Sequence, residues 1–315
     1  MKNQDKILFA AFITSLFSLL SYNSTVNANN YDINTFNISA SNQLYGGKST
    51  YQFKSQYASQ IIIAKSIFPL DYHAMGLDLV FTFYDTIRLK GEIATNISQP
   101  TGTIHHNTNN QWTSENHELQ PTDQDPKSSE TNLTDFEAIN ANLDLELMVP
   151  LGDSMKVFGG IGYQQQTFQH EGRLFELSDS PEGSLSLSRK ATSFKATYQM
   201  IYPLIGMEKQ ISDDSKISAV LKFPAYAWSE YKADDPTVEE FSNSATNKFD
   251  ESTGTGFSGE LSINHRISDK MFLRAGVRYT KIQADSSGLT AEGYNATESL
   301  ESEQLGAIIK YGITL

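Results

Sequence analysis

The sequence predicts an all-β protein, a transmembrane antiparallel up-and-down β-barrel of about ten strands. Segment 304–315 has the period of two that marks a strand, and its polar or small face is interrupted only by Ile308. Tight turns near positions 84, 151, 213 and 269 alternate with long polar segments, as in barrels with short periplasmic turns and long extracellular loops. The other face of 304–315 is apolar: Leu305, Ala307, Ile309, Tyr311, Ile313 and Leu315.

The N-terminus predicts export. Lysines precede an apolar run over 7–20, and a small-residue cleavage site of the A-x-A kind ends at Ala28. The alternative is a membrane anchor, but the run is shorter than the ~20 residues that a spanning helix needs. We therefore expect a signal peptide at 1–28 and one barrel domain at 29–315. No other stretch is long and apolar enough for a helical span, so a membrane-spanning form must be a closed barrel.

Composition excludes several kinds of site. The chain has no cysteine, which in an exported protein removes disulfides, cysteine nucleophiles and thiolate metal sites. Its formal net charge is −13, and lysine and arginine do not cluster. This charge pattern does not indicate a nucleic-acid partner.

The remaining strands follow the same alternation, with apolar residues on the lipid side. The inward residues Arg88, Lys90 and Glu92 carry both signs of charge, which predicts a lumen filled by ion pairs and not an open neutral channel. Central outward positions of the last four strands carry no charge, as expected if Lys or Arg at the bilayer midplane costs ~2–4 kcal/mol. The expected strands cover 36–53 with a break at Gly46-Gly47, 77–83, 87–96, 142–149, 155–168, 194–200, 217–223, 257–264, 273–280 and 304–315.

Polar segments between these strands are expected to be the long outer loops. The second contains His105 and His106, which lack companions at metal-ligand spacing and are expected to be solvated loop residues. The lone His265 is expected at the rim of the barrel. The five loops are expected near 54–75, 98–135, 172–191, 231–254 and 284–300, the fourth of them acidic.

Five short motifs, together with the order of the elements and the lengths of the loops, indicate a family resemblance. The motifs are Ile38-Ser39, Ser59-Gln60, Gly162-Tyr163-Gln164, Tyr202-Pro203-Leu204-Ile205-Gly206 and Ala227-Trp228-Ser229-Glu230. With them the chain resembles the omptins, ten-stranded outer-membrane proteases, over most of 29–315. The resemblance implies the outer membrane of a Gram-negative bacterium, with the loops at the cell surface. It also implies lipopolysaccharide as a structural lipid. That lipid site is poorly matched, because Gln165 and Thr167 stand where acidic and basic partners would be.

The resemblance further implies a proteolytic site. Omptins activate water between an aspartate pair in the second outer loop and an aspartate–histidine pair in the fourth, where a general base takes the proton of the water. Asp123 and Asp125 match the first pair, and Asp235 matches the aspartate of the second. Thr237 stands at the histidine position, and 224–264 contains no histidine. His117 is the candidate substitute base, if it faces Asp235 across the barrel mouth.

Three functions stay open. The first is a surface protein of omptin-like architecture that binds partners and has lost proteolysis. The second is an aspartate-dependent endopeptidase with a rearranged site. The third is a narrow pore, disfavoured because about ten strands with inward charges leave little lumen. Expected partners are outer-membrane lipids, with cationic peptides or host surface proteins at the loops. We expect a monomer without cofactor, metal or nucleic acid.

Overall fold

All regular structure in the described part of the chain is β-strand. The expected signal peptide lies outside it. None of the described residues belongs to a helix that is long and apolar enough to cross a membrane. The computed structural model describes residues 35–57, 60–113, 119–121, 127–175, 191–234, 248–249, 253–289 and 295–315.

Fifteen strands within these ranges form one antiparallel sheet. They are β1 (Thr35–Tyr57), β2 (Gln60–Pro69), β3 (Tyr72–Phe83), β4 (Ile87–Asn96), β5 (Thr103–Thr113), β6 (Leu119–Pro121), β7 (Lys127–Pro150), β8 (Met155–Phe175), β9 (Ala191–Ser212), β10 (Ser215–Lys222), β11 (Tyr226–Asp234), β12 (Lys248–Phe249), β13 (Thr253–Ser268), β14 (Met271–Leu289) and β15 (Asn295–Thr314).

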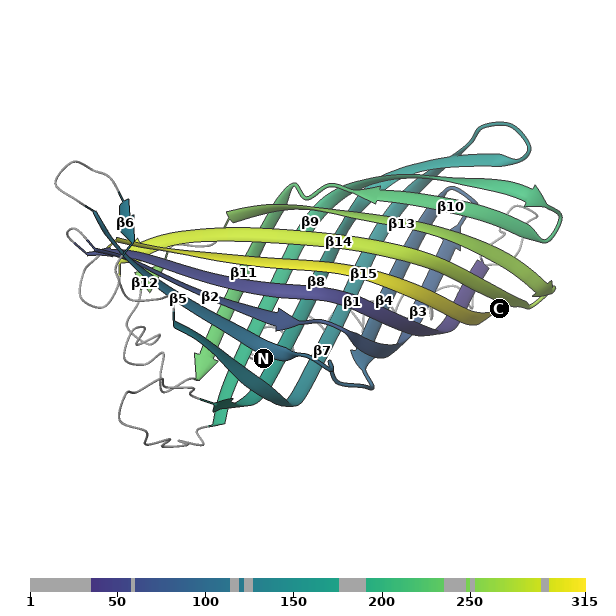
Figure 1. Ribbon diagram of the computed structural model, residues 1–315. Coiled ribbons are helices and arrows are strands. Elements are labelled where there is room, and N and C mark those ends of the chain that lie inside the picture. Colours follow the sequence, from purple (N-terminus) through teal and green to yellow (C-terminus); the bar gives the residue numbers. More distant parts are fainter. Residues whose placement is uncertain are drawn as a thin grey trace.

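The sheet closes into a barrel because β15 pairs with both β14 and β1. The closing register runs from Asn37↔Thr314 to Gln56↔Asn295. Around the ring the order is β1, β3, β4, β7, β8, β9, β10, β13, β14 and β15, which confirms the predicted ten-stranded barrel. The strands β2, β5, β6, β11 and β12 extend the wall at one end (Figure 1).

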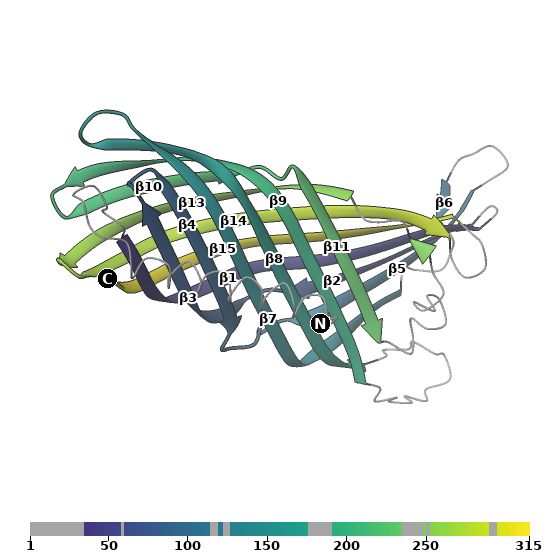
Figure 2. The same ribbon diagram turned by 180° about the vertical axis from the view of Figure 1, so that it is seen from behind.

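The two ends of the barrel differ. The C-terminus and the tight turns lie together at one end, which we call the turn end, and β6 and β12 lie at the other, the loop end (Figures 1 and 2). In the first turn the Phe83 carbonyl accepts a hydrogen bond from the Thr86 amide at 3.0 Å. Tyr84 and Asp85 have φ of 50° and 54°, as a type I′ hairpin turn requires. The predicted turns near 84, 151, 213 and 269 are confirmed.

Exposed apolar side chains form a belt around the outside of the barrel. On β15 it begins at Leu305, 61% exposed, and ends at Ile313, whereas the outward positions 297–303 are polar. Aromatic side chains border the belt on both sides. At the loop side the Trp228 ring lies 6.3 Å from Tyr163 and 5.2 Å from Tyr226, and at the turn side lie Phe36, Phe81 and Phe83. Such girdles are typical of barrels in lipid.

The strands are longer at the loop end than predicted. β1 continues through Gly46-Gly47, where we expected a break, and Gly47 pairs with Gln304. The expected loops 54–75 and 98–135 contain β2, β5, β6 and the beginnings of β3 and β7, and β14 and β15 occupy all of 284–300 except 290–294. Beyond the belt water replaces lipid on the outer face, so the apolar alternation that identifies strands is lost there.

Candidate functional site

The predicted proteolytic residues Asp123, Asp125, Asp235 and His117 lie outside the described residues, as does Thr237. Their geometry therefore stays a prediction. The strands that flank these segments are described, and β5, β7 and β11 all reach the loop end (Figure 2).

The other histidines are placed. His106 is in β5 and not in a loop, contrary to the prediction, and its Nδ1 lies 2.9 Å from Ser66 Oγ on β2. His105 precedes it on the same strand. His265 is exposed near the turn end of β13, with its Nδ1 2.9 Å from Ser215 Oγ. Within the described ranges no three His, Asp or Glu side chains are grouped to hold a metal ion.

At the level of the belt, ion pairs cross the lumen. Arg278 on β14 lies between two carboxylates, with Nη2 2.7 Å from Glu92 Oε2 and 2.8 Å from Glu260 Oε2. Lys310 on β15 bonds to Asp78 on β3, and its Nζ lies 3.0 Å from Glu92 Oε2. A buried charge is tolerated only when it is paired and hydrogen-bonded. The prediction of a lumen filled by ion pairs is thus confirmed.

A second group of charges lies nearer the turn end. Arg88 Nε lies 2.6 Å from Glu146 Oε2, and its Nη1 lies 2.5 Å from Glu208 Oε1. Lys90 Nζ is 2.7 Å from Glu146 Oε1, and Lys216 Nζ is 3.1 Å from Glu208 Oε2. Two carboxylates therefore hold three cations.

Lys222 forms a further buried pair. Its Nζ lies 3.0 Å from Asp144 Oδ2 and 2.9 Å from the Tyr202 hydroxyl. The Tyr202 hydroxyl in turn donates to Asp144 Oδ1 at 2.5 Å. Three strands, β7, β9 and β10, are thus tied together inside the barrel.

A layer of uncharged polar groups follows toward the loop end. The Tyr72 hydroxyl accepts hydrogen bonds from Asn140 Nδ2 at 2.9 Å and from Gln304 Nε2 at 3.2 Å. Gln166 Nε2 donates to Gln304 Oε1 at 2.9 Å, and the Tyr45 ring lies 5.0 Å from the Tyr72 ring. These residues come from β1, β3, β7, β8 and β15, so the layer spans the lumen.

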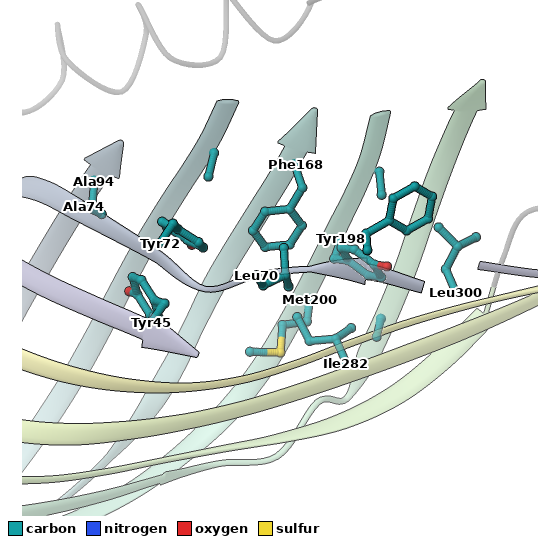
Figure 3. Close-up of a cluster of buried hydrophobic side chains, with 14 of the residues drawn as sticks. Tyr45, Leu70, Tyr72, Ala74, Ala94, Phe168, Tyr198, Met200, Ile282 and Leu300 are labelled. Carbon is teal, nitrogen blue, oxygen red and sulfur yellow. The ribbon is translucent and has the colours of Figure 1, made fainter. Parts of the chain in front are cut away.

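Beyond that layer the lumen is filled by an aromatic cluster. We use this name for Phe68, Phe136, Phe168, His170, Phe194 and Tyr198. Figure 3 shows Phe168 and Tyr198 beside Leu70 and Met200 in the space between the walls, and all four are fully buried. The Phe68 and Phe194 rings lie 5.3 Å apart, and those of Phe168 and Tyr198 lie 6.1 Å apart. Still nearer the loop end, the Tyr51 and Tyr231 rings stack at 3.8 Å. Side chains therefore fill the described lumen from the belt to this level.

His170 is the titratable member of the cluster. Burial lowers the pKa of His170 from 6.5 to about 4, because the charged imidazolium is poorly solvated there. Its outward neighbours on β8, Gln169 and Glu171, are polar, so it lies beyond the apolar belt. The ring is neutral near pH 7, and its Nε2 lies 3.3 Å from the Pro69 carbonyl oxygen.

The aromatic cluster is not among the features predicted from the sequence. The alternation over 194–200 was recognised, but no face was assigned to it. A signal was present, since the residues between the apolar ones are Lys195, Thr197 and Gln199. This reverses the belt pattern and indicates apolar residues inside a water-exposed wall.

Comparison with solved structures agrees with this architecture. The chain is similar to the outer-membrane protease OmpT from Escherichia coli, with a TM-score of 0.51 and 10% identity over 91% of this chain and 99% of that one. The fold is that of an outer-membrane β-barrel. The likeness to OmpT shows the fold alone.

Two further structures match with lower TM-scores. The outer membrane protein OprG from Pseudomonas aeruginosa matches with a TM-score of 0.36 and 12% identity over 92% of this chain and 99% of that one. The translocator domain of the autotransporter NalP from Neisseria meningitidis matches with a TM-score of 0.36 and 10% identity over 98% and 97%. No protein-family model matches the chain, and no curated protein matches its sequence.

Proposed function

We propose that the chain is an outer-membrane barrel of a Gram-negative bacterium that acts as a surface binding protein and does not hydrolyse peptides. The apolar belt, its two aromatic girdles and the barrel fold support the membrane location. The polar wall beyond the belt supports a loop end in water. Lipids of the outer membrane, with lipopolysaccharide as the candidate structural lipid, are the proposed partners of the belt.

The observation that carries this proposal is the filled lumen. Ion pairs, the Tyr72 layer and the aromatic cluster follow one another along the described interior. A pore of about ten strands would need these side chains to leave the lumen, and each buried charge would then lose its partner. The filled lumen supports a closed scaffold that acts through its loop end, and it argues against a narrow pore.

Loss of proteolysis is proposed because Thr237 stands at the omptin histidine position. Threonine cannot take a proton from water near neutral pH. We propose that the barrel is a monomer whose acidic loops, lacking this base, bind partners without cleaving them. The proposed partners are cationic peptides or host surface proteins.

The second candidate is an omptin-type endopeptidase with a rearranged site. It would use Asp123, Asp125 and Asp235, with His117 as the base. The shared fold with OmpT over 99% of that chain favours it, as does the position of the flanking strands β7 and β11 at one end of the barrel.

A fluorogenic peptide library separates the two candidates. The refolded full chain, with lipopolysaccharide added, is compared with its Asp235→Ala and Asp123→Ala variants. No cleavage by a barrel shown to be folded by heat-modifiable gel mobility is the expected result. Cleavage that either substitution abolishes would establish the endopeptidase, and His117→Ala would then test the base.

Planar-bilayer recording tests the closed lumen separately. We expect no stable conductance step from the wild-type chain. A long-lived open step of porin size would contradict the closed-scaffold proposal and favour the pore.

A further inference from the structure

The turn end of the barrel contains a cavity that the proposed function does not use. Its volume is ≈ 200 Å³, and side chains from all ten ring strands and from the β3–β4 turn line it. Asp85, Arg88 and Lys156 are among the lining residues, and Glu208 lies between its cross-strand partners Lys156 and Ser218. The cavity is polar, although the belt around it is apolar.

Positive charge is in excess around this cavity. Lys156 is the cross-strand neighbour of Glu208 but forms no ion pair with any described residue, and Glu208 is already bound to Arg88 and Lys216. Glu146 likewise serves both Arg88 and Lys90. With the unpaired Lys156 added, four cations stand against these two carboxylates, and when the exposed Asp85 is also counted one positive charge remains in excess. The chain as a whole has a net charge of −13.

Two hydrogen-bond donors of the lining are unused. Arg88 Nη2 and Ser218 Oγ are buried and have no hydrogen-bond partner among the described residues. Arg88 is 6% exposed and Ser218 is 7% exposed, and both line the cavity. A buried donor without a partner is unfavourable, so an acceptor supplied from outside would be favoured here.

The cavity also contains a carboxylate, Asp78, but it lies deeper. The register partner of Arg88 is Thr82, four residues along β3 from Asp78, which corresponds to roughly 13 Å of strand. Lys310 bonds to Asp78 at that level. Its Oδ1 is thus paired with Lys310, its Oδ2 has no hydrogen-bond partner among the described residues, and the carboxylate is distant from the free donors.

We propose that this cavity binds a small oxyanion of the phosphate class, held by Arg88, Ser218, Lys156 and Lys216. A tetrahedral oxyanion offers several acceptor oxygens, which suits four donors that converge from three strands, β4, β8 and β10. Planar guanidinium groups and ammonium groups are the usual ligands of phosphate. The anion could be free or could be the head group of a lipid, because the chemistry that recognises it is the same.

Calorimetric titration of inorganic phosphate into the refolded full chain tests the free anion. The protein is kept in a non-ionic, phosphate-free detergent at low salt, and a second arm titrates short-chain phosphatidic acid. The variants are Lys156→Gln and Ser218→Ala. The matched control is Lys270→Gln, because Lys270 is exposed in the β13–β14 turn and does not line the cavity.

Loss of a charge-assisted contact should weaken binding roughly tenfold or more for Lys156→Gln. Ser218→Ala should weaken it by less, and Lys270→Gln should leave it unchanged. Saturable binding of phosphate with this pattern supports a free anion, and the same pattern with phosphatidic acid alone supports a lipid head group. Absence of binding in both arms, or equal weakening by Lys270→Gln, would overturn the proposal. Heat-modifiable mobility shows that each variant has folded.

Discussion

Arg278 donates hydrogen bonds to both carboxylate oxygens of Glu92, at 2.8 and 2.7 Å, although the two residues are 186 positions apart. Their strands, β14 and β4, are separated by β15, β1 and β3 around the ring. The pair therefore crosses the lumen and ties two sides of the barrel together. Glu260 and Lys310 complete its hydrogen bonding.

Replacing Arg278 by methionine should destabilise the barrel strongly. Glu92 and Glu260 would lose a shared cation in a buried site, and such a loss typically costs about 3–5 kcal/mol. Urea unfolding of the refolded protein measures the change in the free energy of unfolding. Arg266→Met is the control, because Arg266 pairs with Asp214 at the exposed turn end. Equal unfolding midpoints for the two variants would contradict a structural role of the Arg278 pair.

A lysine on the apolar belt should be costly. Ile309→Lys places a charge on the lipid side of β15, where we expect a loss of about 2–4 kcal/mol. Ser299→Lys lies on the same face of the same strand beyond the belt and should be nearly neutral. Unfolding in lipid vesicles compares them. If Ser299→Lys were as costly as Ile309→Lys, the boundary of the belt would have to be moved toward the loop end.

The aromatic cluster should contribute to the stability of the barrel through packing and should not act as a gate for ions. Phe168→Ala removes a fully buried ring, for which a loss of about 3–5 kcal/mol is usual. Thr167→Ala on the outward side of β8 serves as the control. The ion pairs of the belt are unaffected by this change, so no conductance should appear in a planar bilayer. A new open step in Phe168→Ala would identify the cluster as the barrier of the lumen.

Acid should lower the free energy of unfolding through His170, which lies toward the loop end. The pKa of His170 is about 4 in the folded chain and about 6.5 when unfolded, so the unfolded chain binds more protons between these values. The free energy of unfolding should therefore fall as the pH drops from about 6.5 to about 4, by at most about 3 kcal/mol, and this contribution is constant above that window.

Comparison of the wild type with His170→Gln isolates this effect, because the other titrating groups are common to both proteins. Urea unfolding at a series of pH values gives the two curves. Their difference should change between pH 4 and 6.5 and be constant above pH 7. Parallel curves over the whole range would rule out His170 as the source.

Much of the fold was predictable within the belt. There each strand has lipid on one side and the lumen on the other, so apolar and polar residues alternate, as in Leu261, Ser262 and Ile263. The inward and outward faces of β10, β13, β14 and β15 follow directly from this pattern. Beyond the belt the outer face contacts water, so the apolar alternation is lost. The same strands were therefore predicted to be loops there.

The sequence predicts that the lumen is ion-paired, but not which charged residues are partners. Arg88, Lys90 and Glu92 indicate an ion-paired lumen, because inward charges of both signs must neutralise one another. Their partners could not be assigned, since Arg278 and Glu92 meet only when the sheet has closed.

The fold class, the inward charges and the absence of a histidine at position 237 follow from the sequence alone. Alternation is a local property of the sequence, and the identity of a residue is known without the tertiary structure. The tertiary structure decided which charges pair, that aromatic side chains fill the lumen beyond the belt, and that unpaired donors gather at the turn end. These depend on which strands face each other across a closed ring, and on the number of residues by which each strand is shifted against its neighbour.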